Sequence, residues 1–193
     1  MPAAALQREL HAPLLLTPAQ LQFYRDNGFI RLKNVLSADL LAHYRDAVEA
    51  AVAAAGDAPL DAQQALDRAD DDYAQAFLQV INLWRTSPDV REFVFGQRLA
   101  HVAAQLVKAR AGGGVRLYHD QALFKAPGGG HTPWHCDQFY WPLASEKTVT
   151  AWVPLEAVPE EMGPLQFAAG SHRKDLGRAV GIGCETTTKR SCS

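Results

Sequence analysis

The stretch "VRLYHDQALFKAPGGGHTPWHCDQFYWPL", residues 115–143, decides the fold class of this 193-residue sequence. Its first ten residues, together with "TVTAWVPLEAV" at 148–158, are rich in β-branched and aromatic residues, which are typical of strands. The intervening "PGGG" at 127–130 is a turn signal. We therefore predict strands on both sides of "HTPWHCDQFYW", a segment that contains two histidines, an aspartate and four aromatic rings.

Upstream of residue 110 the sequence is dominated by helix signals. Thr17, Pro18 and Gln20 fit a capping box with proline at the first helical position, and Gly28 can end that helix. Ser37 begins a second helix that runs to Gly56. Apolar spacing and Ser-Pro-Asp predict further helices at 73–84, after Ser87 and at 97–110, whereas "FIRLKNV" at 29–35 alternates like a strand.

This order, with helices first and strands later, predicts an α+β fold in which N-terminal helices pack on a sheet sandwich or barrel. We expect an N-terminal arm at 1–16 and a single domain at 17–180, helical to about 110 and β-rich from about 115. A closed sandwich or barrel uses about seven or eight strands, and there is room for about three or four. We therefore expect an incomplete β core, followed by an atypical polar tail at 181–193 in a chain that stops midway through its fold.

Composition excludes several classes of protein. The formal net charge is −2, so no broad basic surface predicts binding to nucleic acid or anionic lipid. No apolar stretch reaches the roughly 18–20 residues of a membrane helix. Cys136, Cys184 and Cys192 form no CxxC pair, which favours a reducing, cytoplasmic setting. The acidic run at 67–75 is interpreted as a solvated loop or helix end, because no calcium-loop spacing follows it.

His135 and Asp137 form an H-x-[D/E] pattern, two thirds of the two-histidine, one-carboxylate set that holds non-haem iron(II). On a strand, residues i and i+2 point to the same side, so both side chains can reach one ion. With 7 histidines and 21 acidic residues, about one such triplet is expected by chance. The prediction of an iron site therefore depends on the surrounding aromatic residues, because "PW" and "QFYWPL" would form a largely dry pocket with apolar walls.

Other metal or catalytic patterns are disfavoured. No H-E-x-x-H or C-x-x-C motif is present, and Pro133 prevents His131 and His135 from sharing a helical face. "AAGSHR" is not the G-x-S-x-G of a serine hydrolase. His119 is interpreted as a hydrogen-bonded core or pocket-wall residue before a metal ligand.

Four ordered segments, "LTPAQLQFYRDNGFIRLKNVLS", "VRLYHDQALFKAPGGGHTPWHCDQFYWPL", "TVTAWVPL" and "GPLQFAAGSH", resemble the phytanoyl-CoA dioxygenase family. The resemblance runs from about residue 17 to about residue 175. It implies a double-stranded β-helix (jelly-roll) core, Fe(II), the cosubstrate 2-oxoglutarate and O2. The implied reaction is hydroxylation of an unactivated C–H bond in a small-molecule substrate, and the aromatic residues favour an apolar metabolite.

The resemblance also implies roles for individual residues. His135 and Asp137 match the first two iron ligands. Cys136 stands where the family commonly has glutamine. The expected cosubstrate contacts are Gln121, Trp152 and Asn82, although Asn82 fits helix packing equally well. The expected walls of the substrate pocket are Trp134, Phe139, Tyr140 and Trp141.

The sequence departs from the family downstream. In the family, the third iron ligand is a second histidine beyond "GSH". An arginine about ten residues later binds the distal carboxylate of 2-oxoglutarate. After Asp137 the sequence has only His172, which is structural in the family, and Arg173, Arg178 and Arg190 at unsuitable positions. We therefore expect a truncated, impaired oxygenase, or alternatively a non-catalytic binding or regulatory fragment that retains the aromatic pocket. No motif specifies the oligomeric state.

Overall fold

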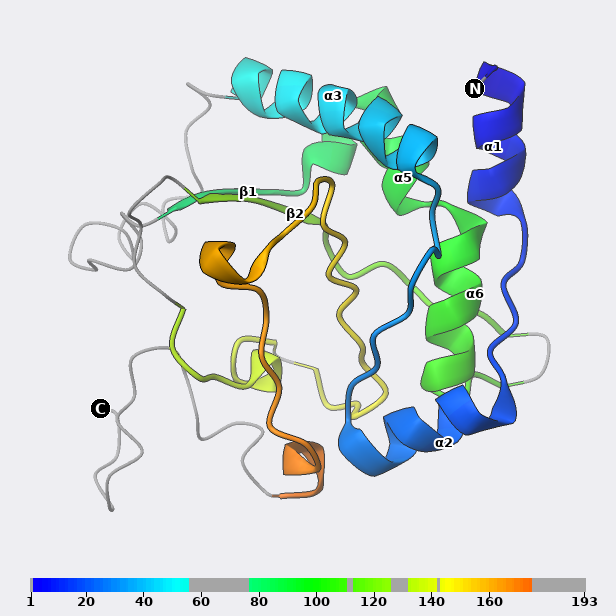
Figure 1. Cartoon of the computed structure of the whole chain (residues 1–193), viewed down its shortest axis with the longest axis vertical. Helices are drawn as coiled ribbons and strands as arrows, with labels where there is room; N and C mark the ends of the chain where they lie inside the picture. Colours follow the sequence, from blue (N-terminus) through cyan, green and yellow to red (C-terminus); the bar gives the residue numbers. More distant parts are fainter. Residues whose placement is uncertain (1, 56–76, 111–112, 126–131, 142, 175–193) are drawn as a thin grey trace.

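The computed structural model describes residues 2–55, 77–110, 113–125, 132–141 and 143–174. The helices are α1 (Ala3–His11), α2 (Pro18–Asn27), α3 (Ala38–Ala55), α5 (Pro88–Val94) and α6 (Gln97–Leu106). Two strands, β1 (Phe77–Ile81) and β2 (Gln121–Lys125), form an antiparallel pair. Short 3-10 turns are η1 (Leu83–Arg85), η2 (Asp137–Phe139), η3 (Glu160–Met162) and η4 (Ser171–Arg173). In Figure 1, α1 and α6 lie side by side, and the extended segments occupy the other side of the molecule.

Helix α2 begins and ends as predicted. The Thr17 hydroxyl accepts a hydrogen bond from Gln20 N, and the Gln20 side chain accepts one from Thr17 N, which completes the capping box. Pro18 occupies the first turn, where its missing N–H costs nothing. Gly28 then adopts φ 83°, a left-handed conformation that glycine reaches without steric penalty. The predicted starts of α3 and α5 are also confirmed, and Ser87 caps α5.

Residues 3–11, within the predicted N-terminal arm, form a helix that is part of the core. Leu6 and Leu10 of α1 are buried against Leu40 and Tyr44 of α3. The Glu9 carboxylate accepts hydrogen bonds from the backbone N and hydroxyl of Ser37, at the start of α3. Apolar spacing at 6 and 10 is helical, so α1 is held mainly by tertiary packing of one face.

The predicted helix at 73–84 is wrong over its described part. Phe77–Ile81 is β1, with Phe77 paired to Lys125 and Ile81 to Gln121 of β2. Val80 packs with Ala122 of β2 against the buried Val48 and Val52 of α3. The ladder and this cross-strand packing outweigh the local helical spacing, because β2 is available as a partner and β-branched residues pack well in sheets.

Two predicted strands are not hydrogen-bonded strands. Residues 29–35 and 148–158 run without a ladder in the part of the chain that the structure describes. Of the predicted strand at 115–124, only 121–124 pair, as part of β2. The alternation of the two unpaired segments still determines burial: Ile30, Leu32 and Val149 pack around Leu16 and Val102. Alternating burial needs only an extended backbone, whereas a ladder also needs a neighbouring strand in register.

The described residues thus form an α+β arrangement, in which helices pack on extended segments and a two-stranded sheet. None of the described helices is both long and apolar enough to cross a membrane. The acidic run at 67–75, the tail at 181–193, His131, Cys184 and Cys192 lie outside the described residues.

Candidate metal centre

His135 and Asp137 converge on each other. His135 Nε2 lies 3.3 Å from Asp137 Oδ1. The intervening Cys136 is extended, with φ −114° and ψ 122°, which turns the flanking side chains to the same side. Residues 132–136 form no β ladder with another described segment, and Asp137 begins η2. The extended conformation of one residue therefore brings the pair together without a ladder.

The His135 ring is oriented by the backbone. Its Nδ1 lies 2.9 Å from Pro133 O, and a carbonyl oxygen only accepts hydrogen bonds, so this contact requires a proton on Nδ1. Nε2 is then the nitrogen that faces Asp137. This is the usual arrangement of a metal-binding histidine, whose other N–H donates to a carbonyl or carboxylate.

Electrostatics at the pair favour a positive charge between the two side chains. The hydrogen bond to Asp137 raises the pKa of His135 above its usual value, against the opposing effect of burial. The same bond lowers the pKa of Asp137, with further help from Thr150. The imidazole is 27% exposed and the carboxylate 47% exposed, so an ion could reach them from solvent.

Thr150 is a site residue that sequence reasoning missed. Its hydroxyl donates a 2.7 Å hydrogen bond to Asp137 Oδ2, the oxygen that does not face His135. The two carboxylate oxygens thus have different partners, and the carboxylate plane is held. Only the position of Thr150 two residues before Trp152, on the same side of an extended segment, could have indicated this contact.

The aromatic residues form a connected row rather than the predicted dry pocket. Phe139 and Tyr140 meet edge to face at 5.0 Å, and Tyr140 lies 6.4 Å from the rings of both His135 and Trp141. Trp134 is 60% exposed, and Phe139 and Tyr140 are also exposed. Residues 132–143 lack covering strands among the described residues, so these rings do not enclose a water-free space there. Their role as substrate walls stays a prediction.

His119 extends this aromatic row. Its ring centroid lies 4.5 Å from that of Trp141, and its role as a pocket wall stays a prediction. Its Nε2 lies 3.5 Å from Gln121 Oε1, at the limit of a hydrogen bond, and its buried Nδ1 has no hydrogen-bond partner among the described residues. The positive charge that His119 can carry also contributes to the lowered pKa of Asp137. His119 therefore lies near the pair, and Gln121 lies beside His119 at the start of β2.

The two other predicted cosubstrate contacts lie in different settings. Trp152 is exposed, two residues beyond Thr150, while the alternate residues Val149 and Val153 pack toward the helices. Asn82 does not lie in a helix: it follows β1 in a left-handed conformation with φ 61°, and its Oδ1 accepts a 3.1 Å hydrogen bond from Trp84 Nε1. The structure thus gives Asn82 a local structural contact.

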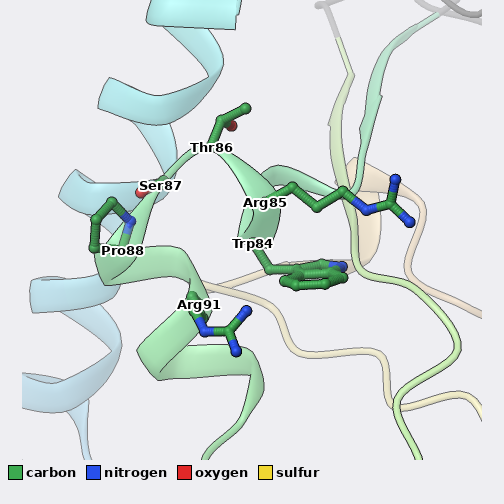
Figure 2. Close-up of a pocket in the computed structure, with 6 residues that line it drawn as sticks. All are labelled: Trp84, Arg85, Thr86, Ser87, Pro88 and Arg91. Atoms are coloured by element: carbon green, nitrogen blue, oxygen red, sulfur yellow. The ribbon is translucent and has the colours of Figure 1, made fainter.

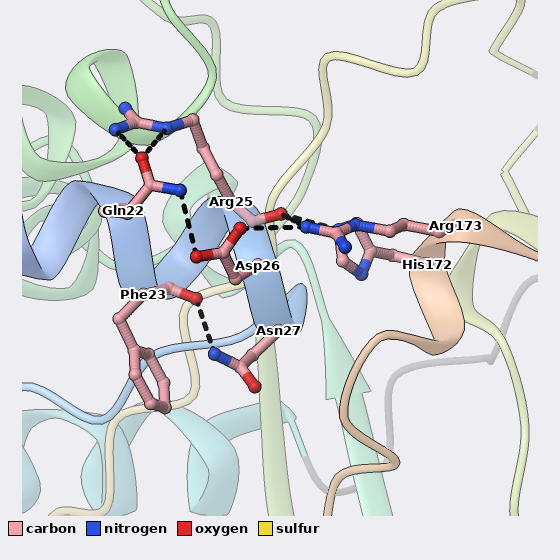
Figure 3. A network of polar contacts seen from close by, with 7 residues as sticks. All are labelled: Gln22, Phe23, Arg25, Asp26, Asn27, His172 and Arg173. Carbon is pink, nitrogen blue, oxygen red and sulfur yellow. Dashed lines mark hydrogen bonds and ion pairs between the residues drawn. The ribbon is translucent and has the colours of Figure 1, made fainter.

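A third donor is not brought to the pair within the described ranges, where no cluster of three His, Cys, Asp or Glu side chains could hold a metal ion. His172 lies instead at the C-terminus of α2, with Nε2 3.1 Å from Arg25 O (Figure 3). Arg173 donates to the same carbonyl and forms an ion pair with Asp26 at 2.9 Å. His172 and Arg173 therefore serve a structural contact, as expected for His172. Arg178 and Arg190 lie outside the described residues.

The geometry of the pair fits two ligands of one metal ion. Donor atoms bound at about 2.1 Å and at about 90° to each other lie about 3 Å apart. The 3.3 Å separation of His135 Nε2 and Asp137 Oδ1 is close to this value. An imidazole and a carboxylate with fixed second partners are the donors of non-haem iron sites.

The donor types and the separation of the pair are those of a candidate metal site. A sequence model of the phytanoyl-CoA dioxygenase family matches residues 24–189, and the chain belongs to that family. The chain is 26% identical over 168 residues to the peroxisomal phytanoyl-CoA dioxygenase of Mus musculus. This aligned region covers 84% of the chain and 49% of the mouse protein. The chain thus spans about half the length of this curated relative. No solved structure matches this chain.

Proposed function

We propose that this chain is a dioxygenase of the phytanoyl-CoA dioxygenase type, which uses Fe(II) and 2-oxoglutarate to hydroxylate a small apolar substrate with O2. The observation that carries the proposal is the convergence of His135 Nε2 and Asp137 Oδ1 at 3.3 Å. Membership of the family supports the same cofactors. When bound, Fe(II) would activate O2, the oxidant, and 2-oxoglutarate would supply two electrons as it is converted to succinate and CO2, so that one oxygen atom can enter an unactivated C–H bond.

The residues of the chain would hold and orient these groups. His135 would bind iron through Nε2 while its Nδ1–H stays on Pro133 O. Asp137 would bind through Oδ1 while Thr150 holds Oδ2. The proton between His135 Nε2 and Asp137 Oδ1 must leave before a metal ion can bind to these two atoms.

Further parts of the proposal follow from the family resemblance. Gln121 and Trp152 would contact 2-oxoglutarate, and Trp134, Phe139, Tyr140 and Trp141 would line the substrate site. Residues 17–180 would form one domain on a jelly-roll core. The exposed rings support this assignment, because apolar side chains at the surface near a polar pair are typical of an incompletely covered binding site.

The proposal includes weak iron binding and slow turnover. The described residues supply two donors, and His172 and Arg173 are engaged at α2. An arginine–carboxylate contact contributes about 1.5–3 kcal/mol per hydrogen bond, so its loss would weaken cosubstrate binding by about one to two powers of ten for each bond. A second candidate function is binding without catalysis, which the exposed aromatic row also favours.

Calorimetric titration of the purified chain with Fe(II) under argon tests the proposal. We expect one weak site that is lost in His135→Ala and Asp137→Ala. His101→Ala is the matched control, because His101 is an exposed histidine on α6. Succinate formation from 2-oxoglutarate then separates the two candidate functions, because slow, iron-dependent formation supports the dioxygenase. In the titration, iron binding that neither His135→Ala nor Asp137→Ala changes would refute the proposed metal site.

A further inference from the structure

A cavity of about 400 Å³ that is widely open to solvent lies where η1 meets α5, on residues distinct from those of the candidate metal centre. Its lining consists of Trp84, Arg85, Thr86, Ser87, Pro88 and Arg91 (Figure 2). This volume is near the lower end of the roughly 300–1,000 Å³ of small-molecule sites. The cavity therefore suits a small ligand or one end of a larger one.

Two arginines share one aromatic ring in this cavity. The guanidinium carbons of Arg85 and Arg91 lie 5.4 and 5.1 Å from the Trp84 ring centroid, and Figure 2 shows the indole between the two side chains. Arg91 also lies 4.8 Å from the Phe95 ring centroid. A cation–π contact holds a guanidinium near the ring without a hydrogen bond, so its N–H donors stay available for another partner.

The indole is itself held in place. Trp84 Nε1 donates to Asn82 Oδ1 at 3.1 Å, and Trp84 N donates to Asp120 Oδ1 at 3.3 Å. The Phe95 ring contacts the indole edge to face at 5.6 Å. Hydrogen bonds to Asn82, just after β1, and to Asp120, just before β2, therefore hold Trp84 in place. The two arginines that contact its ring are thus positioned before a ligand binds.

No carboxylate of the described residues forms an ion pair with either arginine. Neither Arg85 nor Arg91 forms an ion pair or a side-chain hydrogen bond within the part of the chain that the structure describes. Glu92, next to Arg91, accepts hydrogen bonds from Tyr44 and Gln7. Asp89, two residues before Arg91, projects to a different side of α5.

The positive charge is local. The chain carries a formal net charge of −2, so two adjacent cations with no ion pair among the described residues do not reflect a generally basic surface. Like charges that share one ring repel each other, and an anion placed between their N–H donors removes that repulsion. Guanidinium groups bind phosphate and carboxylate oxygens through paired N–H donors.

We propose that Trp84, Arg85 and Arg91 form a binding site for an oxyanion, the phosphate or carboxylate group of a small ligand. The inference goes beyond the proposed dioxygenase function and does not depend on it. The oxyanion could belong to a phosphorylated compound or to a carboxylic acid, which share this chemistry.

Calorimetric titration of the full chain at constant ionic strength tests the site, with pyrophosphate in one arm and succinate in the other. We expect saturable binding of at least one probe, and the stronger arm identifies the anion class. Arg85→Gln and Arg91→Gln should each weaken binding by about 10-fold or more, because each removes a charge-assisted contact. Arg91→Lys should weaken it less, since it retains the charge but not the paired donors.

Arg116→Gln is the matched control, because Arg116 is exposed and does not line the cavity. It should leave the affinity unchanged. Circular dichroism should show a native fold for both cavity variants, since Arg85 and Arg91 are exposed. Heats that do not saturate, or an affinity that falls equally in Arg116→Gln and the cavity variants, would overturn the proposal; if a glutamine variant unfolds, the Arg91→Lys comparison decides in its place.

Discussion

His172 lies against Gly28 so closely that a Cβ atom at position 28 would come 2.4 Å from His172 Nδ1. The two residues are far apart in sequence, and their contact joins η4 to the C-terminus of α2. His172 Nε2 and Arg173 Nη2 both lie within hydrogen-bond distance of Arg25 O (Figure 3). In addition, Gly170 N donates a hydrogen bond to Asn27 O. Donors and positive charge are favourable here, because the last carbonyls of a helix lack intrahelical partners and carry partial negative charge.

Gly28→Ala should therefore destabilise the protein in two ways. An L-residue at φ 83° costs about 1–2 kcal/mol, and displacement of η4 would lose hydrogen bonds worth about 0.5–1.5 kcal/mol each. Gly163→Ala is the matched control, because Gly163 has φ 68° but open space around it. Chemical denaturation should show a larger loss of unfolding free energy for Gly28→Ala. Equal losses would mean that the His172 contact contributes little.

Thr150→Val should lower metal affinity by about 10–100-fold, the usual effect of removing a partner that orients a ligand. The valine keeps the shape of threonine but removes the 2.7 Å hydrogen bond to Asp137 Oδ2. It should also raise the pKa of Asp137, because that bond helps to lower it. Thr148→Val is the control, since the Thr148 hydroxyl contacts Gln138 instead. Carboxyl NMR titration and Co(II) calorimetry measure the two effects, and similar results for both variants would contradict the role of Thr150.

Tyr44→Phe should destabilise the protein by about 1.5–3 kcal/mol at neutral pH, the contribution of a hydrogen bond to a charged group. The fully buried Tyr44 donates to Glu92 Oε2 at 3.1 Å. Burial, followed by the charge of Glu92, raises the pKa of Tyr44 to about 12, against about 10 in an unfolded chain.

The folded state therefore keeps the Tyr44 proton at a pH where the unfolded state loses it. This contribution to stability is fully present below about pH 10 and is lost as the pH rises toward about 12. The difference in unfolding free energy between wild type and Tyr44→Phe should shrink over that interval. Tyr118→Phe, at an exposed ring, should change little at any pH; a constant difference for Tyr44→Phe would show that its pKa is not raised.

Asn82→Ala and Asn82→Gly should separate two structural contributions. Both variants lose the hydrogen bond from Trp84 Nε1, at about 0.5–1.5 kcal/mol. Alanine also meets the cost of a left-handed residue at φ 61°, about 1–2 kcal/mol, which glycine does not. Thermal denaturation should rank wild type above Asn82→Gly and Asn82→Gly above Asn82→Ala. A glycine variant as unstable as the alanine variant would assign the whole effect to the lost hydrogen bond.

Local signals predicted much of the helical part. The capping box at Thr17 and the serine cap at Ser87 involve residues three positions apart, so their partners are present in any sequence window. Val80 shows the limit of such signals. Its segment has helical spacing, and it becomes a strand because β2, about forty residues later, supplies a ladder. Nothing local reveals a partner at that distance.

The candidate metal centre divides in the same way. The spacing of His135 and Asp137 was sufficient to predict that they face one side, since one extended residue separates them. The contacts that orient them differ in range: Pro133 is a neighbour, whereas Thr150 comes from another segment. Sequence reasoning placed His135 and Asp137 on one side and missed Thr150, their distant partner.

By itself, the sequence determined the helix caps, the alternation that buries one side of each extended segment, and the two donors of the candidate site. These properties depend on residues a few positions apart, where chain geometry alone sets direction. Only the tertiary structure decided that 77–81 pairs with β2, that His172 packs on Gly28, and that Arg85 and Arg91 share the Trp84 ring. Each of these depends on which segments meet and on which polar groups find partners there, and local pattern does not specify either.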